Sequence, residues 1–310
     1  MLKKMGIYRG INLGGWLSQC DYSDERLNEF IKEEDFARIA SWKVDHVRIP
    51  VDYNVLDDGR GYQKLDWAAD MCRKYGLKMV LDLHKTAGFS FDVGEQETGF
   101  FDSESYQERF YALWENIARR YGQMTDLMAF ELLNEVTDQS FIDAWNRISH
   151  EAIRRIRAIA PEMIILVGSY HNNSAPAVKD LAAPYDDKCL YNFHCYDPLF
   201  FTHQGAGWVP ELIGKTGITY EESGATEAFF EKHFAPALEA AERNHTTLYC
   251  GEYGVIDQAA PEEAVKWLKA INAVFEKHGI ARAMWSYKQM DFGLSDARLD
   301  GVRDEMVKYL

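Results

Sequence analysis

The 310-residue chain predicts a (β/α)₈ barrel that forms a single domain over residues 1–310. Eight short apolar runs alternate with longer segments of helical spacing, which is the order of a barrel built from strand–helix units. The chain is longer than the roughly 250 residues typical of this fold, and the excess falls mainly after two of the runs, at 85–104 and 195–226. No Pro-, Gly- or Ser-rich linker divides the sequence.

Each element is expected from its own local pattern. Strands are expected where apolar runs recur, at 6–13, 46–50, 78–84, 128–134, 164–168, 189–194, 247–252 and 282–287. Helices are expected at 34–42, 64–76, 106–122, 140–161, 227–244 and 261–279. In the third of these, Phe110, Leu113, Trp114 and Ile117 share one face, as a helix packed on a core requires. Gly76, Gly122 and Gly279 stand where C-cap glycines end helices.

Composition excludes several classes of partner. The formal net charge is −15 and no cluster of Lys and Arg stands apart from the acids, so nucleic acid and anionic membranes are poor partners. Five scattered cysteines without a CxxC pair indicate reduced thiols. The first 15 residues hold no apolar signal region, so a cytoplasmic protein is expected, or a secreted one if a signal has been removed.

The ends of the predicted strands carry reactive side chains. In a (β/α)₈ barrel the active site lies at the C-terminal ends of the strands. The residues expected there are Arg48, His84, Asn134, Glu135, His194, Tyr196, Glu252 and Trp285. Six strands therefore bring two carboxylates, two imidazoles, an arginine, an amide and two aromatic rings to one mouth, which indicates catalysis rather than packing.

Two glutamates on facing strands suggest paired acid/base chemistry. If the carboxyl groups lie about 5–5.5 Å apart, one can attack as a nucleophile while the other donates a proton, whereas a wider gap admits a water and inverts the product. Each ionised carboxylate raises the pKa of the other. Arg48 is expected to keep the nucleophile ionised, Asn134 to donate to a sugar hydroxyl, and Trp285 to offer a flat face to a sugar ring. Glu131, inside its apolar run, is expected to pair within the barrel.

Seven segments carry a family resemblance that runs from Gly10 to Gly293: "GINLGGW", "HVRIP", "LDLH", "LLNE", "NFHCYDP", "CGEYG" and "MWSY". They resemble glycoside hydrolase family 5, the retaining, cellulase-like barrels. The resemblance implies Glu135 as acid/base and Glu252 as nucleophile. It also implies a substrate-binding shell of Arg48, His84, Asn134, His194, Tyr196 and Trp285. Val136 stands where the family often has proline, a loop-shaping residue that does not react.

Outer sugar contacts are expected from three loops. The stretch "FFTHQGAGW" (200–208) resembles the strand-6 loop of cellulase-type members, which makes His203, Gln204 and Trp208 candidates for substrate binding. "FDVG" (91–94) and Trp16 are further candidates.

The resemblance implies a retaining hydrolase of β-1,4-glucan or cello-oligosaccharides, of endoglucanase or cellodextrinase type, with no cofactor and no metal. A β-1,3-glucan exo-glucosidase of the same family is the nearest alternative. A metal-dependent barrel hydrolase using Asp82, His84 and His194 is a rival of another class, although it leaves both glutamates unexplained. A carbohydrate-binding protein without catalysis is a second rival, against which the presence of both glutamates argues.

Overall fold

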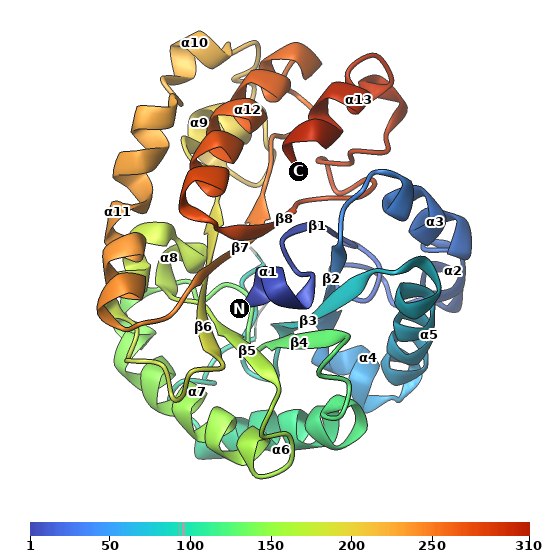
Figure 1. Ribbon diagram of the computed structural model, residues 1–310, viewed down its shortest axis with the longest axis vertical. Helices are drawn as coiled ribbons and strands as arrows, with labels where there is room; N and C mark the ends of the chain where they lie inside the picture. The colour runs from blue at the N-terminus through green and yellow to red at the C-terminus, as the bar shows by residue number, and fades with distance from the viewer. Residues whose placement is uncertain (93, 95–96) are drawn as a thin grey trace.

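The computed structural model describes residues 1–92, 94 and 97–310, and it confirms the predicted barrel. Eight parallel strands pair in chain order and β8 returns to pair with β1, which closes the sheet (Figure 1). Closure leaves no free edge for another chain to pair with. The strands are β1 Arg9–Asn12, β2 His46–Asp52, β3 Lys78–Lys85, β4 Met128–Glu131, β5 Ile164–Val167, β6 Cys189–Cys195, β7 Leu248–Tyr253 and β8 Ala281–Met284.

Long helices cover the outside of the barrel between most pairs of strands. They are α3 Glu33–Ser41, α5 Arg60–Tyr75, α6 Glu104–Tyr121, α7 Ile142–Arg157, α11 Glu227–Arg243 and α12 Pro261–His278. Shorter helices are α1 Leu2–Met5, α2 Asp24–Glu29, α4 Tyr53–Asp57, α8 Tyr170–Asn173, α9 Leu199–Thr202, α10 Tyr220–Ser223 and α13 Arg303–Met306. No helix among the described residues is long and apolar enough to cross a bilayer.

The expected helix ends are explained by their caps. α5 and α12 stop where Gly76 and Gly279 adopt left-handed φ angles of 72° and 66°, a conformation that glycine takes without steric cost. Gly122 ends α6 for a different reason, because its φ of −62° suits any residue. A Cβ there would lie 2.4 Å from the Ala118 carbonyl oxygen and 2.6 Å from the Ala160 Cβ, so close approach requires the glycine.

The barrel interior changes from apolar to charged along its axis. α1 lies over one end of the barrel (Figure 1), where Leu2 packs with an apolar layer of inward residues that includes Val80, Leu166 and Tyr249. One step further along the strands the inward residues are polar and fully buried: Asn12, Arg48, Asp82, Glu131 and Asn192. Charges that far from water must be paired. This layer therefore consists of paired polar groups directly beneath the residues at the strand ends.

Several strands are shorter than their apolar runs suggest. β4 ends at Glu131 and β8 ends at Met284, so Asn134, Glu135 and Trp285 lie in the loops just past the strands. β1 begins at Arg9 rather than at residue 6, because Ile7 and Tyr8 belong to the segment that packs under the barrel with α1. No long helix follows β5, where only α8 and a 3₁₀ helix, Ala175–Asp180, lead to β6.

Candidate active site

The polar side chains predicted at the strand ends are organised around Arg48. Its guanidinium is fully buried, and Nε and Nη2 each donate to one carboxylate oxygen of Glu131 at 2.7 Å. Glu131 therefore pairs within the barrel, as the sequence indicates. The other contacts of the guanidinium, all within 3.0 Å, go to Asn12, Asp82, Asn134 and Glu252.

Replacing Arg48 by leucine should lower the free energy of unfolding by about 3–5 kcal/mol, because Glu131 and Asp82 would stay buried without their cation. The loss should be greatest at high pH, since at low pH the stranded carboxyl groups can take up protons. Urea unfolding at pH 5 and pH 8 measures both effects. Arg120→Leu is the matched control, because it removes an exposed ion pair with Asp66 and should change stability by less than about 1 kcal/mol. Equal losses in the two variants would contradict this account.

Glu252 is held as an anion at the end of β7. Its Oε1 accepts from Arg48 Nη1 at 2.7 Å and its Oε2 accepts from the Tyr196 hydroxyl at 2.9 Å. Both donors stabilise the charged carboxylate, and between them they fix the plane of the group. Burial and the neighbouring Glu252 raise the pKa of Tyr196 well above its usual range, so the tyrosine keeps its proton and remains a donor.

Glu135, unlike Glu252, lies in surroundings that favour the protonated form of its carboxyl group. Its Oε1 is 2.7 Å from His194 Nδ1, and its Oε2 accepts from Asn172 Nδ2 at 2.9 Å. Among the described residues no arginine forms an ion pair with it, and burial raises the pKa of its carboxyl group to about 7. Burial is the largest cause of this shift. The sequence had suggested repulsion between the two carboxylates instead, and that effect is smaller than burial. Glu135 can therefore carry a proton near neutral pH while Glu252 is ionised.

The two carboxyl groups are close enough for direct attack. A carboxylate oxygen of Glu135, one of Glu252 and a ring nitrogen of His194 all lie within 4.8 Å of one another. Inverting enzymes separate their carboxyl groups by about 6.5–9.5 Å to admit a water, whereas retaining enzymes keep them about 5–5.5 Å apart. The spacing in this protein favours the retaining arrangement.

The two active-site histidines differ in charge. Burial lowers the pKa of His194 to about 4, so it is neutral, and it lies between the two glutamates. His84 is equally buried, which lowers its pKa, but the ion pair with Asp82 at 2.6 Å outweighs burial and raises that pKa to about 9. His84 is therefore a cation at neutral pH.

Trp285 forms one wall of the site. Its ring lies parallel to the His84 imidazole, with centroids 5.9 Å apart. A Cβ on Gly14 would lie 2.7 Å from the Trp285 ring, so the first glycine of the pair in "GINLGGW" is needed to let the indole take this position. Two buried donors beside this wall, Asn134 Nδ2 and His84 Nε2, have no hydrogen-bond partner among the described residues. Both are suited to bonding a sugar hydroxyl.

The loop after β6 contains residues with different roles. Trp208 is 43% exposed and its ring meets the edge of His203, which in turn packs against Tyr196. These ring contacts connect Trp208 through His203 to Tyr196. Gln204 is fully buried, and its amide bonds the backbone of Phe201 and Ile218, which uses both ends of the group to hold the loop together. We therefore assign Gln204 a loop-holding role in place of the expected sugar contact.

The expected contacts from the other two loops are partly corrected. Trp16 is fully buried, with its Nε1 donating to the Leu27 carbonyl at 3.0 Å, so it belongs to the core and cannot contact a sugar. In the segment 91–94, Phe91 packs edge-on against His84 at 4.8 Å and thus borders the site. Val93 lies outside the described residues.

Sequence reasoning missed the residues that hold the reacting groups. Asn192 donates to Glu131 at 2.7 Å and accepts from the Gly251 backbone, and Asn12 bonds both Arg48 and the Gly251 carbonyl. A polar residue on the inward-facing side of an otherwise apolar strand is the signal that could have found them. Alternate side chains of a strand point to the same face, so such a residue points into the barrel. Asn172 lies outside any strand, in a run in which residues 171–173 all have φ between 50° and 61°. Only the Asn-Asn pair hinted at that left-handed turn.

Asn172 should influence the pH at which Glu135 loses its proton. Because its amide donates to the ionised form of Glu135, it lowers the pKa of that carboxyl, and removing it should raise the pKa further above 7. We expect Asn172→Gly, which keeps the left-handed backbone without strain, to move the basic limb of the kcat/KM profile to higher pH than in the wild-type enzyme. His171→Gly is the control, since it changes the same turn and leaves the limb in place. A limb that does not move would show that Asn172 has no such role.

The metal-dependent rival finds little support in this geometry. Asp82, His84 and His194 do not gather into a ligand group in the part of the chain that is described; the group that forms here is Glu135, His194 and Glu252. Within it, both oxygens of Glu252 already accept from Arg48 and Tyr196. A guanidinium 2.7 Å from one ligand atom opposes a second cation there.

A closed barrel with two buried carboxyl groups at its mouth, one ionised and one able to hold a proton, defines the class: a glycoside hydrolase. The sequence model described as cellulase (glycosyl hydrolase family 5) matches residues 10–291, so the chain belongs to that family, which is a retaining one. The expected family, fold and class of enzyme are thereby confirmed.

Individual relatives agree with this assignment. Cellodextrinase A of Ruminococcus flavefaciens is 61% identical over 288 residues, 91% of this chain and 86% of that protein. Endoglucanase C of Acetivibrio thermocellus is 36% identical over 335 aligned positions, with 97% of each chain covered. Among solved structures, Cel5A of Thermotoga maritima in complex with mannotriose superposes with a TM-score of 0.81 at 26% identity, covering 99% of this chain and 98% of the other.

Proposed function

We propose that this enzyme hydrolyses β-1,4-linked gluco-oligosaccharides, with Glu135 as acid/base and Glu252 as nucleophile. The observation that carries the proposal is the asymmetric pair of carboxyl groups: Glu252 bonded to Arg48 and Tyr196, and Glu135 with its pKa raised to about 7, with oxygens within 4.8 Å of each other. The substrate class rests on the high identity to a cellodextrinase.

In the first step the Glu135 carboxyl donates its proton to the glycosidic oxygen while a Glu252 oxygen attacks the anomeric carbon. The bond to the departing sugar breaks, and a glycosyl ester of Glu252 forms. Positive charge develops on the sugar ring as the bond breaks. The carboxylates of Asp82, Glu131 and Glu252 outnumber the cations Arg48 and His84, so the buried site favours that charge.

In the second step Glu135, now a carboxylate, takes a proton from water as the water attacks the same carbon. The ester bond breaks, Glu252 leaves as a carboxylate, and Glu135 is protonated again. Esterification removes the negative charge of Glu252, which lowers the pKa of the neighbouring Glu135 and prepares it to act as a base. Asn134 Nδ2 and His84 Nε2 are the donors we assign to sugar hydroxyls, Trp285 provides the platform for the ring, and Trp208 extends the binding surface.

The substrate is tested by the products formed from matched β-1,4- and β-1,3-linked gluco-oligosaccharides, with β-mannan and xylan alongside. We expect kcat/KM to be highest on the β-1,4 series, with products whose anomeric configuration is retained at the time of cleavage. Preferential release of single glucose units from β-1,3 chains would keep the chemistry and replace the substrate by that of the exo-glucosidase alternative. Loss of activity in excess chelator would instead favour the metal-dependent rival.

A further inference from the structure

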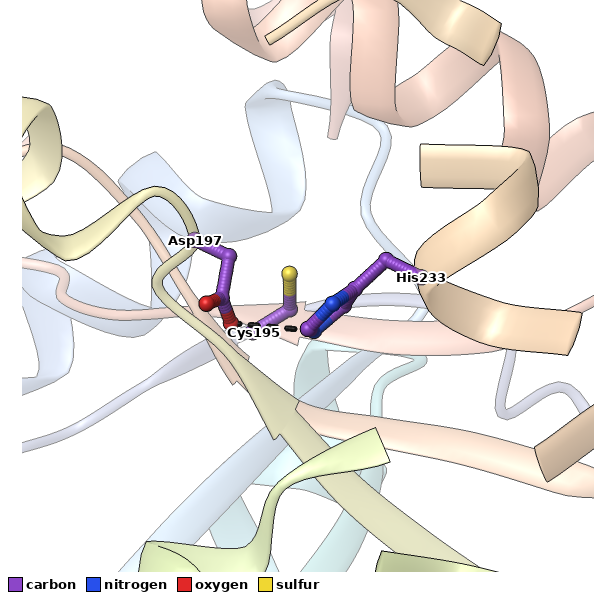
Figure 2. Close-up of side chains that lie close together, drawn as sticks. All are labelled: Cys195, Asp197 and His233. Atoms are coloured by element: carbon purple, nitrogen blue, oxygen red, sulfur yellow. Dashed lines mark ion pairs between the residues drawn. The ribbon is translucent and has the colours of Figure 1, made fainter. Parts of the chain in front are cut away.

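Three side chains of metal-ligating type meet behind the active site. Cys195 is the last residue of β6, Asp197 follows it in the next loop, and His233 comes from α11 (Figure 2). Figure 2 shows the thiol between the carboxylate and the imidazole. One ligand atom from each residue lies within 4.8 Å of those of the other two.

The contact between His233 and Asp197 resembles two ligands of one ion. His233 Nε2 is 3.0 Å from Asp197 Oδ2, yet this buried nitrogen makes no aligned hydrogen bond with any described residue. Bonds of about 2.0–2.2 Å from a tetrahedral Zn²⁺ place two N or O ligands about 3.3–3.6 Å apart. Small side-chain adjustments would bring all three atoms onto one ion.

The surrounding residues fix the three groups and leave one side open. The Trp267 Nε1 donates to the Asp197 backbone carbonyl at 3.0 Å, and the Phe229 ring stacks on His233 with centroids 5.8 Å apart. The Cys195 side chain is buried, whereas the Asp197 side chain is 40% exposed. An ion could therefore enter past Asp197 and keep a water as its fourth ligand.

We propose that Cys195, Asp197 and His233 form a binding site for a thiophilic divalent cation of the Zn²⁺ type. One sulfur, one nitrogen and one oxygen donor suit Zn²⁺ better than the hard cations Mg²⁺ or Ca²⁺. The ion ties β6 to α11 across the outside of the barrel. It thereby braces the strand end that carries His194 and Tyr196. Binding replaces the proton of the Cys195 thiol, which is released to solvent.

Co²⁺ is the probe, because a cobalt–thiolate bond gives a near-ultraviolet charge-transfer band that oxygen and nitrogen ligands do not. Titration of the reduced wild-type protein should produce this band with a stoichiometry of one, and Zn²⁺ should abolish it, since Zn²⁺ binds such sites more tightly. The Glu135, His194 and Glu252 group offers no sulfur, so binding there cannot produce the signal.

Cys195→Ser should abolish the band, while Cys72→Ser, at a buried thiol on α5, should retain it. His233→Gln, at a partly exposed position, should keep the fold and weaken Co²⁺ affinity by at least about tenfold. Its control is His278→Gln on α12, which should bind as the wild type does. Zn²⁺ should raise the Tm of the wild type and not that of Cys195→Ser. Absence of the band, or a band that survives in Cys195→Ser, overturns the proposal and leaves the hydrolase function untouched.

Discussion

Glu252→Gln is expected to lower kcat by about 10⁴-fold or more on every β-glycoside that the enzyme cleaves. The amide keeps the shape of the side chain and can still accept from Arg48, so binding should change far less than turnover. The neutral amide oxygen is, however, too weak a nucleophile to replace the carboxylate and form the glycosyl ester. Initial rates on an aryl β-cellobioside, with unfolding curves to show that the variant is folded, measure the effect.

A second variant separates loss of the nucleophile from damage to the site. Glu252→Gly opens space beneath the anomeric carbon, so added azide should restore turnover and yield the α-glycosyl azide, the product of a single inversion. Glu131→Gln is the control: it removes another of the carboxylates bonded to Arg48 and should show no azide rescue, because Glu131 does not face the substrate. Turnover of Glu252→Gln within about tenfold of the wild type would remove Glu252 from the mechanism.

The barrel and its reactive strand ends were predictable because the sequence shows two patterns, the apolar runs of strands and the helical spacing between them. Alternating apolar runs and helical stretches fix the order of elements, and a parallel barrel must bring all its strand ends to one mouth. The same reasoning separated Glu131 from Glu135, since a glutamate inside an apolar run needs a buried partner. Arg48 provides that partner with two bonds of 2.7 Å.

Other features depend on contacts that no local pattern encodes. Trp16 and Trp208 look alike in sequence, but only the three-dimensional packing buries the first against Leu27 and leaves the second exposed. Gln204 is polar and lies in a substrate loop, yet the backbone of that loop uses its amide. Asn172 reaches Glu135 through a left-handed turn after β5, a position 37 residues away along the chain. The pKa of Glu135 likewise follows from burial, which is a property of the whole fold.

Glu135→Ala is expected to separate the two steps of the reaction by their dependence on the leaving group. Cello-oligosaccharides leave as poor alkoxides and need the proton, so their kcat/KM should fall by about 10²–10⁴-fold. Glycosides of acidic phenols need no proton to depart, and their kcat/KM should be nearly unchanged. Their ester intermediate should then accumulate, because no base activates water. The basic limb that Glu135 gives the wild-type pH profile, near pH 7, should disappear.

Azide provides the stereochemical check on Glu135. It needs no general base, so it should attack the accumulated ester and release the β-glycosyl azide, the opposite anomer to that from Glu252→Gly. Asp138→Ala, three residues further along the same loop at a position outside the carboxyl pair, is the control and should leave the leaving-group dependence unchanged. If activated and unactivated substrates slowed equally, Glu135 would not be the proton donor.

The same carboxyl group should reduce the stability of the protein at high pH. Burial raises the pKa of Glu135 from 4.5 to about 7, so the folded state binds this proton more tightly than the unfolded state does. Its contribution is therefore favourable below pH 4.5 and is lost as the pH rises through 7, a difference of about 3 kcal/mol. Glu135→Gln, which cannot ionise, should unfold at higher urea than the wild type at pH 8 and approach it at pH 5. A stability difference that does not change with pH would mean that burial does not hold the proton on Glu135.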